Sequence, residues 1–220
     1  DRFEIASQIN LKGTGIGTFS DRLRDAVRGG GPIDSGDALR QNQGVGSGAG
    51  VQPNELTSMT DDQARHLADL TRLGMAGNLA DFVLIDKDGA VKKGSEIDYN
   101  GAPGGYAADP TEVVNYVSKH DNQTLWDMIS YKAAQEADLD TRVRMQAVSL
   151  ATVMLGQGIA FDQQGSELLR SKSFTRDSYD SGDWFNRVDY SLQDNNYNVG
   201  MPRSSDDGSN YDIIARVKDA

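Results

Sequence analysis

The 220-residue sequence contains no cysteine, which excludes disulfide bonds, thiol catalysis and zinc–thiolate sites. With only two histidines, His66 and His120, it also lacks the ligands of a histidine-rich zinc centre. No apolar run approaches the roughly eighteen residues that a membrane helix requires. Asp1–Asn10 lacks the charged-then-apolar layout of a signal peptide, so we expect any export signal to lie elsewhere in a parent chain.

Positive charge is also scarce, because 22 Lys and Arg residues face 33 Asp and Glu residues and the net charge is -11. Nucleic-acid binding depends on clustered Lys and Arg, so this balance argues against polyanionic partners. A neutral, hydroxyl-rich ligand such as a glucan fits better. The alternative that the acidic charge only maintains solubility remains open.

Glycine, by contrast, is abundant, with 24 residues concentrated in the segments 13–17, 29–50 and 101–105, which we expect to be loops. The stretch Gly29–Pro53 is longer than the irregular segments of most compact domains, which indicates a part of a larger protein. The first segment lacks the G-x-G-x-x-G spacing and a following Walker lysine. It therefore does not predict a nucleotide site.

Local patterns in the first half predict two helices and a hairpin. Ser20–Arg28 begins with a capping serine and ends before Gly29, and Thr60–Gly74 begins with acidic residues. Phe82–Lys92 reads as two strands joined by an Asp-Gly turn. The alternative, a calcium loop beginning at Asp86, lacks its final acid because that position is Ile97.

The second half alternates strands and helices. We expect strands at Val113–Val117 and Gly158–Phe161, with helices at Leu125–Glu136 and Asp140–Leu155 between them. The apolar stripe of the longer helix comprises Val143, Ala147, Leu150, Ala151 and Met154. Each strand ends in polar residues. This order is typical of a parallel sheet or a barrel, and it does not distinguish the two.

A histidine and an aspartate, His120 and Asp121, directly follow the strand at Val113–Val117. Residues at the carboxyl ends of parallel strands line active sites in such architectures, so this pair is a candidate catalytic site. Three alternatives remain open on the residues alone: a cap for the next helix, a metal ligand pair, or part of a catalytic triad.

A second cluster, Phe174–Arg187, combines acidic, amide and aromatic residues. Both tryptophans, Trp126 and Trp184, stand near polar segments, and aromatic rings beside carboxylates and amides bind sugars. The alternative that Trp184 and Phe185 are core residues remains open.

Several of these segments resemble one family. Tyr116–Asn122 is similar to the strand-seven motif of the α-amylase superfamily, glycoside hydrolase family 13. Phe19–Gly29 resembles the stretch from strand six to helix six of type I pullulanases. Gly165–Lys172 and Tyr179–Asn186 resemble the end of strand eight and the loop after it. The motifs follow the family's order and cover essentially the whole chain.

The resemblance implies an α/β fold of the (β/α)8 TIM-barrel type. Residues 1–220 would form the C-terminal portion of the catalytic barrel, with strands six to eight at Ile9–Thr18, Val113–Val117 and Gly158–Phe161. The remaining strands would lie outside this sequence. A barrel cannot close on three strands, so the resemblance also implies that this segment alone is inactive.

The family hydrolyses the α-1,6-glucosidic linkages of pullulan, amylopectin and limit dextrins with retention of configuration. In that chemistry Asp121 would be the transition-state stabiliser and His120 would bond the same sugar. The nucleophile and the acid/base would precede Asp1. By position, the expected substrate-binding residues are Asn122, Asp177, Trp184, Arg187, Asp21 and Arg24.

The resemblance also implies the partners, which would be an α-glucan and the rest of the same polypeptide, without nucleic acid. It implies a secreted or cell-surface bacterial enzyme. No cofactor is required for the chemistry, although this superfamily often binds structural calcium. The competing hypothesis is a noncatalytic glucan-binding module. An isoamylase or neopullulanase would conflict with the loop Ser181–Asn186.

Overall fold

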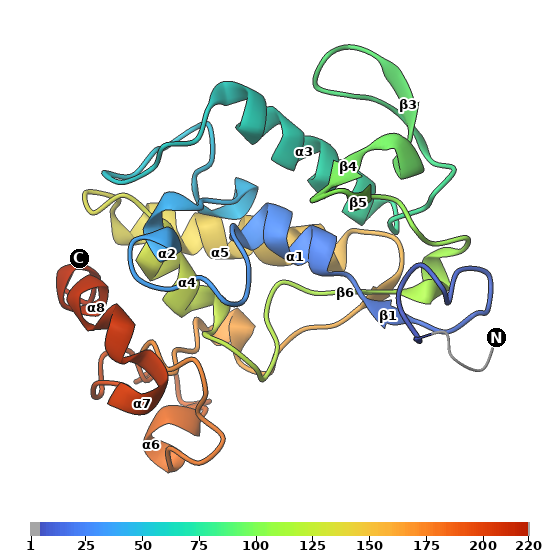
Figure 1. The fold of residues 1–220 in the computed structure, drawn as a ribbon. Helices are drawn as coiled ribbons and strands as arrows, with labels where there is room; N and C mark the ends of the chain where they lie inside the picture. The colour runs from blue at the N-terminus through green and yellow to red at the C-terminus, as the bar shows by residue number, and fades with distance from the viewer. Residues whose placement is uncertain (1–4, 220) are drawn as a thin grey trace.

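The structure is a computed structural model that describes residues 5–219, so residues 1–4 and 220 of the expected domain lie outside the described residues. It is a mixed α/β fold, as the strand and helix alternation predicts (Figure 1). The helices are α1 (Asp21–Arg28), α2 (Ala38–Gln41), α3 (Asp61–Met75), α4 (Leu125–Lys132), α5 (Leu139–Met154), α6 (Asp183–Asn186), α7 (Ser204–Asp207) and α8 (Tyr211–Val217). The strands are β1 (Thr18–Phe19), β2 (Val83–Ile85), β3 (Val91–Lys93), β4 (Asp98–Tyr99), β5 (Ala102–Pro103), β6 (Val113–Asn115) and β7 (Ile159–Ala160).

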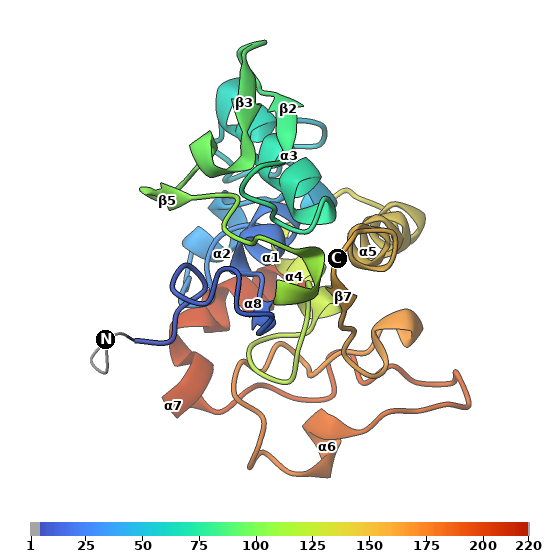
Figure 2. The same cartoon turned by 90° about the vertical axis from the view of Figure 1, so that its right-hand side faces the viewer.

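Strands β1, β6 and β7 form a parallel sheet with β6 in the centre. Thr18 pairs with Val113, and Val114 pairs with Ile159. Parallel neighbours require long crossover connections. Here α1 to α3 connect β1 to β6, and α4 and α5 connect β6 to β7. The antiparallel hairpins β2–β3 and β4–β5 lie beside α3, away from this sheet (Figure 2).

Helix α1 forms the middle of the molecule and packs on α3, α4 and α5 (Figure 1). Its Leu23 and Val27 are fully buried in a cluster with residues of α4 and α5. Ser20 caps its N-terminus by accepting a hydrogen bond from Leu23 N (3.4 Å), and Gly29 ends it. Both boundaries agree with the sequence prediction, as do those of α3 and of the β2–β3 hairpin.

Several expected boundaries are wrong, two of them by four residues or more. The strand predicted at Ile9–Thr18 is only Thr18–Phe19, because residues 8–15 form turns. Gly13 and Gly15 have φ values of 80° and 75°, which interrupt an extended strand. The helix predicted to reach Glu136 ends at Lys132, where Ala133 adopts an extended conformation. The other two strands of the sheet are shorter than predicted by one or two residues at an end.

The predicted apolar stripe of α5 is not its buried face. Val143 and Met154 are 36% and 61% exposed, whereas Arg142 and Gln146 are buried. Gln146 Nε2 donates to Ser166 O (2.9 Å), and Arg142 Nε donates to Ala137 O (3.0 Å). The buried face is therefore mixed: Val153 packs in the apolar core, and the buried polar side chains satisfy backbone carbonyls. Periodicity alone cannot detect those carbonyls.

The glycine-rich segment after α1 is more ordered than expected. It contains α2 and a 3-10 helix at Val45–Ser47, which packs on α1 and α5. The backbones at Gly29 and Gly44 approach closely. A Cβ at Gly29 would lie 2.3 Å from Asn42 O, and one at Gly44 would lie 2.3 Å from Val27 O. The glycines therefore allow the chain to pass beneath α1.

The C-terminal helix α8 covers α4 on the side opposite the hairpins (Figure 1). Ile213, Ile214 and Val217 of α8 pack in one apolar cluster with Tyr131 of α4 and with Phe174. Phe174 lies in the long segment after β7, so this cluster fixes that segment against α4.

Candidate active site

The candidate catalytic loop follows the central strand β6. Tyr116, Val117 and Ser118 continue from the strand as buried residues, and His120 and Asp121 are then exposed. Ser118 Oγ donates to Gln163 Oε1 (2.6 Å) and accepts from Leu125 N (3.2 Å). The start of the loop is therefore fixed both to the segment after β7 and to the first turn of α4.

A lysine and a histidine of the same loop lie beside Asp121. Lys119 Nζ donates to Asp121 Oδ2, and His120 Nε2 lies 3.3 Å from Asp121 Oδ1. The hydrogen bond from Lys119 lowers the pKa of Asp121, with smaller charge contributions from Lys119, His120 and Lys172. Asp121 is therefore an ionised carboxylate at neutral pH, and at 57% exposure it is accessible.

Asn122 follows in the left-handed conformation, with φ 64°, and turns the chain back toward α4. The N-cap of α4 is Thr124, whose side chain accepts from Asp127 N (3.2 Å). The capping role considered for Asp121 thus belongs to Thr124. Asp121 is left without a structural partner in α4.

Three aromatic rings lie side by side at the carboxyl ends of the three parallel strands. Phe19 packs edge-to-face on Tyr116 (5.0 Å between centroids) and on Phe161 (5.4 Å). Arg24 Nη1 donates to the Tyr116 hydroxyl (2.6 Å), and Arg24 also pairs with Asp25. The predicted site residue Arg24 is thus joined to the strand that leads to Asp121.

Asp21, at the start of α1, accepts from Arg22 Nη1 (2.8 Å) and from Gln8 Nε2 (2.9 Å). It lies at the end of β1, on the same edge of the sheet as the other predicted residues. Its pairing with Arg22 fixes its orientation.

The segment after β7 carries the remaining predicted residues on its surface. Asp177 is exposed, and Trp184, in α6, is 74% exposed. Arg187 forms an ion pair with Asp194. The core interpretation of Trp184 is therefore wrong. Trp126, by contrast, is 5% exposed and belongs to the core of α4, so it cannot present its ring to a sugar.

The structure brings His120, Asp121 and Asn122 together in one loop, and it places Asp177, Trp184 and Arg187 on another. Within residues 5–219, no hydrogen bond or ion pair joins the second group to Asp121. The two segments are connected instead through a residue that sequence reasoning missed. Lys172 Nζ donates to His120 O (3.1 Å). Nothing in its sequence surroundings distinguishes this lysine from a surface residue.

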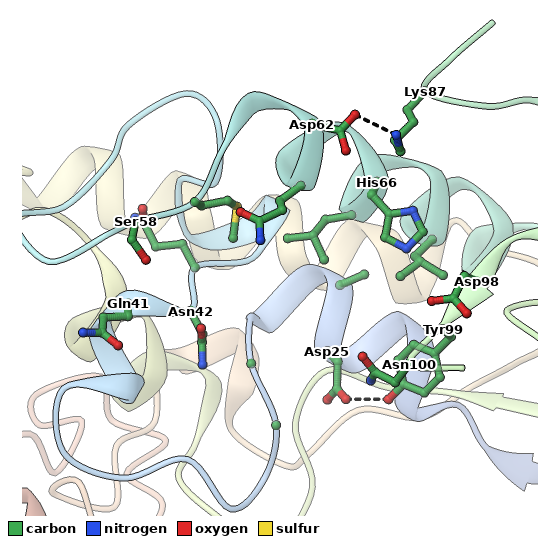
Figure 3. A pocket seen from close by; sticks show the side chains of 18 residues that line it. Asp25, Gln41, Asn42, Ser58, Asp62, His66, Lys87, Asp98, Tyr99 and Asn100 are labelled. Atoms are coloured by element: carbon green, nitrogen blue, oxygen red, sulfur yellow. Dashed lines mark hydrogen bonds and ion pairs between the residues drawn. The ribbon is translucent and has the colours of Figure 1, made fainter. Parts of the chain in front are cut away.

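A cavity of about 670 Å³ lies elsewhere, between α1, α3 and the β4–β5 hairpin (Figure 3). Its lining includes His66, Asp98 and Asn100, and none of the predicted site residues. Its acidic groups are largely paired within the fold: Asp62 with Lys87 (2.6 Å), and Asp25 with the Tyr99 hydroxyl (2.6 Å). The cavity is therefore separate from the loop after β6 and from the other predicted site residues.

In the described part of the chain, no group of three or more histidine or acidic residues is arranged to hold a metal ion. Among the same residues, no helix combines the length and apolarity needed to span a membrane.

The fold and the site thus define an α/β protein with an ionised, accessible carboxylate at the carboxyl end of the central strand of a parallel sheet. A scan of protein-family models finds no match to the chain. Individual proteins do match. The chain is 97% identical to the pullulanase of Klebsiella aerogenes over 220 residues, which is all of this chain and 20% of that protein. It is 45% identical to pullulanase 1, chloroplastic, of Arabidopsis thaliana, over 95% of this chain and 22% of that protein.

Solved structures agree. A crystal structure of Klebsiella pneumoniae pullulanase complexed with maltotriose matches with a TM-score of 0.97 and 97% identity, covering 99% of this chain and 21% of that one. The pullulanase of Bacillus acidopullulyticus matches with a TM-score of 0.61 and 25% identity, over 88% of this chain and 18% of that one. The chain belongs to the pullulanase family, which confirms the resemblance, and it spans about a fifth of the length of the curated bacterial relatives.

Proposed function

We propose that this chain is one segment of a starch-debranching enzyme that hydrolyses α-1,6-glucosidic linkages in pullulan, amylopectin and limit dextrins. The observation that carries the proposal is the 97% identity to a pullulanase across all 220 residues. The position of Asp121 supports it, because an ionised carboxylate follows the central parallel strand, where the chemistry of an α/β enzyme is located.

The segment would supply strands six to eight of a (β/α)8 barrel, with residues 1–220 as the C-terminal portion of that catalytic domain. Two features support this arrangement. Consecutive strands β1, β6 and β7 are parallel neighbours joined through helices, as in a barrel. The rings of Phe19, Tyr116 and Phe161 form a row across the three strand ends, which resembles the side-chain layers that fill barrel interiors.

In this proposal Asp121 acts on the sugar at the point of cleavage. As positive charge develops at the anomeric carbon, its carboxylate accepts hydrogen bonds from ring hydroxyls and those bonds strengthen in the transition state. Lys119 keeps Asp121 ionised, and His120, which is 84% exposed, donates to a hydroxyl of the same sugar. The nucleophile and the acid/base would come from other segments of the polypeptide.

The donor side of the substrate would be bound by Asn122, Asp177, Trp184 and Arg187, with Asp21 and Arg24 near the end of β1. The exposed ring of Trp184 supports its part, because an uncovered indole can stack on a sugar. An α-glucan such as the maltotriose bound by the Klebsiella pneumoniae enzyme is the expected ligand, and the rest of the polypeptide is the other partner.

We also propose that the parent enzyme is secreted or at the cell surface of a bacterium, because its polymeric substrate cannot enter a cell intact. The chemistry requires no cofactor in this scheme. A structural calcium ion would need ligands from other segments or from backbone oxygens, since residues 5–219 offer no three-acid cluster for it.

The test uses the full-length polypeptide with Asp121→Asn. We expect kcat for reducing-sugar release from pullulan to fall at least 10²- to 10³-fold, because one preorganised electrostatic group is lost. Maltotriose binding, measured by calorimetry, should persist. The matched control is Asp88→Asn, an exposed aspartate in the β2–β3 turn that also contacts a lysine; it should retain full activity.

A noncatalytic glucan-binding module differs in activity, because both hypotheses expect Asp121→Asn to keep glucan binding. Such a module needs no carboxylate at a reaction centre, so the unmodified full-length polypeptide would bind glucan and release no sugar. That result would overturn the proposed function, and so would an Asp121→Asn enzyme with unchanged kcat.

A further inference from the structure

A buried acid and a buried lysine lie behind the candidate catalytic loop without forming part of its surface. Asp127, in α4, is fully buried, and its carboxylate accepts hydrogen bonds from Ser171 Oγ and from Lys172 N (2.8 Å). Burial raises the pKa of Asp127, while these hydrogen bonds favour its ionised form. The carboxylate therefore fixes the backbone at residues 171–172 against α4.

The side chain of Lys172 continues from that fixed point to the loop after β6. It is 1% exposed, and its Nζ donates to the backbone carbonyl of His120 (3.1 Å). Burial lowers the pKa of Lys172 to about 8, so the side chain is mostly protonated at neutral and acidic pH. Asp127, Lys172 and His120 O thus form a continuous connection from the buried interior of α4 to the peptide that precedes Asp121.

Ser118 fixes only the start of the loop, and the contacts of Asp121 itself are local. Asp121 bonds the half-buried Lys119, two residues earlier, and approaches its exposed neighbour His120, and all three lie in one turn. Asn122 then adopts the left-handed conformation. Contacts within a turn fix the conformation of the turn but not its position relative to the rest of the protein. The donor from Lys172 fixes the peptide immediately before Asp121 relative to the core.

We propose that Asp127 and Lys172 are positioning residues for the reaction. Through the hydrogen bond of Lys172 to the carbonyl of His120, they hold the carboxylate of Asp121 in the position from which it contacts the sugar. This inference rests on the proposed function of Asp121. Both residues act at a distance from the substrate, since neither side chain reaches the exposed surface of the loop.

The expected effect is on kcat rather than on substrate binding. Misplacement of a catalytic group by about 1 Å can cost on the order of 10²-fold in rate. In the full-length enzyme, Lys172→Met removes the donor to His120 O. We expect kcat on pullulan to fall about 10- to 100-fold, with KM within about threefold of the unmodified enzyme. Asp127→Asn, which weakens the hold on residues 171–172, should change kcat in the same direction.

Lys132 provides a matched control. It is also fully buried, and its Nζ donates to the backbone carbonyls of Leu39 (2.9 Å) and Asn42 (2.6 Å) in and after α2. Lys132→Met therefore removes the same kind of lysine–carbonyl contact where no catalytic loop is involved. It should change the thermal midpoint but leave kcat within twofold for the folded enzyme.

A double-mutant cycle with Asp121→Asn separates positioning from general destabilisation. If Lys172 acts through Asp121, Lys172→Met should cost much less in kcat when Asp121 is already Asn. Equal losses in both backgrounds would overturn the proposal, and so would a Lys172→Met enzyme with kcat within twofold of normal. If Lys172→Met does not fold, Lys172→Gln replaces it, because glutamine keeps a polar side chain but is too short to reach His120 O.

The two proposals fail differently. If Asp121→Asn itself keeps full activity, the proposed function fails and the positioning role fails with it. If Asp121→Asn is inactive while Lys172 variants are fully active, only the positioning role is wrong.

Discussion

Two buried cations of this chain, Lys132 and Arg40, donate to backbone carbonyls. Lys132 donates to Leu39 O and Asn42 O, whereas Arg40 donates to Tyr131 O (2.7 Å) and Ala133 O (3.2 Å) and also pairs with Glu55. These carbonyls lie at helix ends, where backbone acceptors lack intrahelical partners. Each cation thus joins two segments that are distant in sequence. Within the described residues Lys132 has no ion pair with an acid, so the cost of burying its charge makes the stability of the fold depend on pH.

Burial lowers the pKa of Lys132 to about 7, well below its ordinary value of 10.5. The unfolded chain therefore binds this proton more tightly than the folded chain between about pH 7 and 10.5, and the folded state gains stability as pH rises through that window. Relative to Lys132→Met, the unmodified full-length protein should gain up to about 1.4 kcal/mol per pH unit there. Unfolding midpoints of both proteins at pH 7, 8 and 9 measure the effect. Midpoints that change in parallel would contradict it.

At the scale of elements, the boundaries of the helices depend on specific side-chain oxygens. Ser20 Oγ accepts from Leu23 N at the start of α1 and also donates to Asn78 Oδ1 (2.6 Å), which lies beyond α3. Thr60 caps α3 in an exposed position, with a reciprocal bond to Gln63. The two caps have similar chemistry but different burial, so their removal should have different costs.

We expect Ser20→Ala to destabilise the folded state by about 1 to 3 kcal/mol, because the loss of the cap also leaves Asn78 Oδ1 buried without its donor. Thr60→Ala should cost about 0.5 to 1 kcal/mol, because water replaces the lost bond. Thermal unfolding of both variants in the full-length protein measures the difference. Equal shifts would show that the bond to Asn78 contributes nothing.

Glu112 joins the turn before β1 to the 3-10 helix before β6. Its carboxylate accepts from Gly15 N (2.9 Å) and Ala108 N (2.9 Å), and these and neighbouring backbone N–H groups lower its pKa to about 2. Because the folded pKa lies below the ordinary 4.5, the stabilisation is present above about pH 4.5 and is lost as pH falls toward 2.

Glu112→Gln should therefore unfold at a lower temperature than the unmodified protein at pH 7, by about 2 °C or more. The difference should shrink between pH 4.5 and pH 2. Circular dichroism melts of both full-length proteins at pH 7, 4 and 2.5 test this. A difference that stays constant with pH would show that the charge of Glu112 is not what joins the two segments.

At the scale of the whole molecule, much apolar surface is exposed on elements that belong to the core of an α/β protein. Phe19 and Ile159, in the outer strands of the sheet, are 43% and 48% exposed. Val148 and Leu155, in and after α5, are 52% and 74% exposed. The curated relatives are about five times longer than this chain, and in the proposed parent enzyme other segments would cover these faces.

We therefore expect the 220-residue chain, produced alone, to bind a hydrophobic dye and to release no reducing sugar from pullulan. The full-length polypeptide, under the same conditions, should bind little dye and be active. The short, open edges of β1 and β7 add a tendency to aggregate. Activity of the isolated chain would contradict both the barrel arrangement and the need for carboxylates from other segments.

The sequence by itself determined the local elements and the family. The capping residues Ser20 and Thr60, the turn at Asp88-Gly89 and the polar ends of the strands act within a few residues, so they can be recognised without a structure. The motif around His120 and Asp121 identified the family because its order of residues is specific, and the high identity to known pullulanases confirms that identification.

The tertiary structure alone decided what each face of those elements contacts. Gln146 of α5 is buried because it meets the carbonyl of Ser166 in a distant segment, and Glu112 bonds Gly15 in the turn at residues 8–15 from 97 positions away. Lys172 contacts the loop before Asp121 from 52 positions away. Such contacts depend on which backbone groups lack partners once the chain is packed, and no local pattern records that.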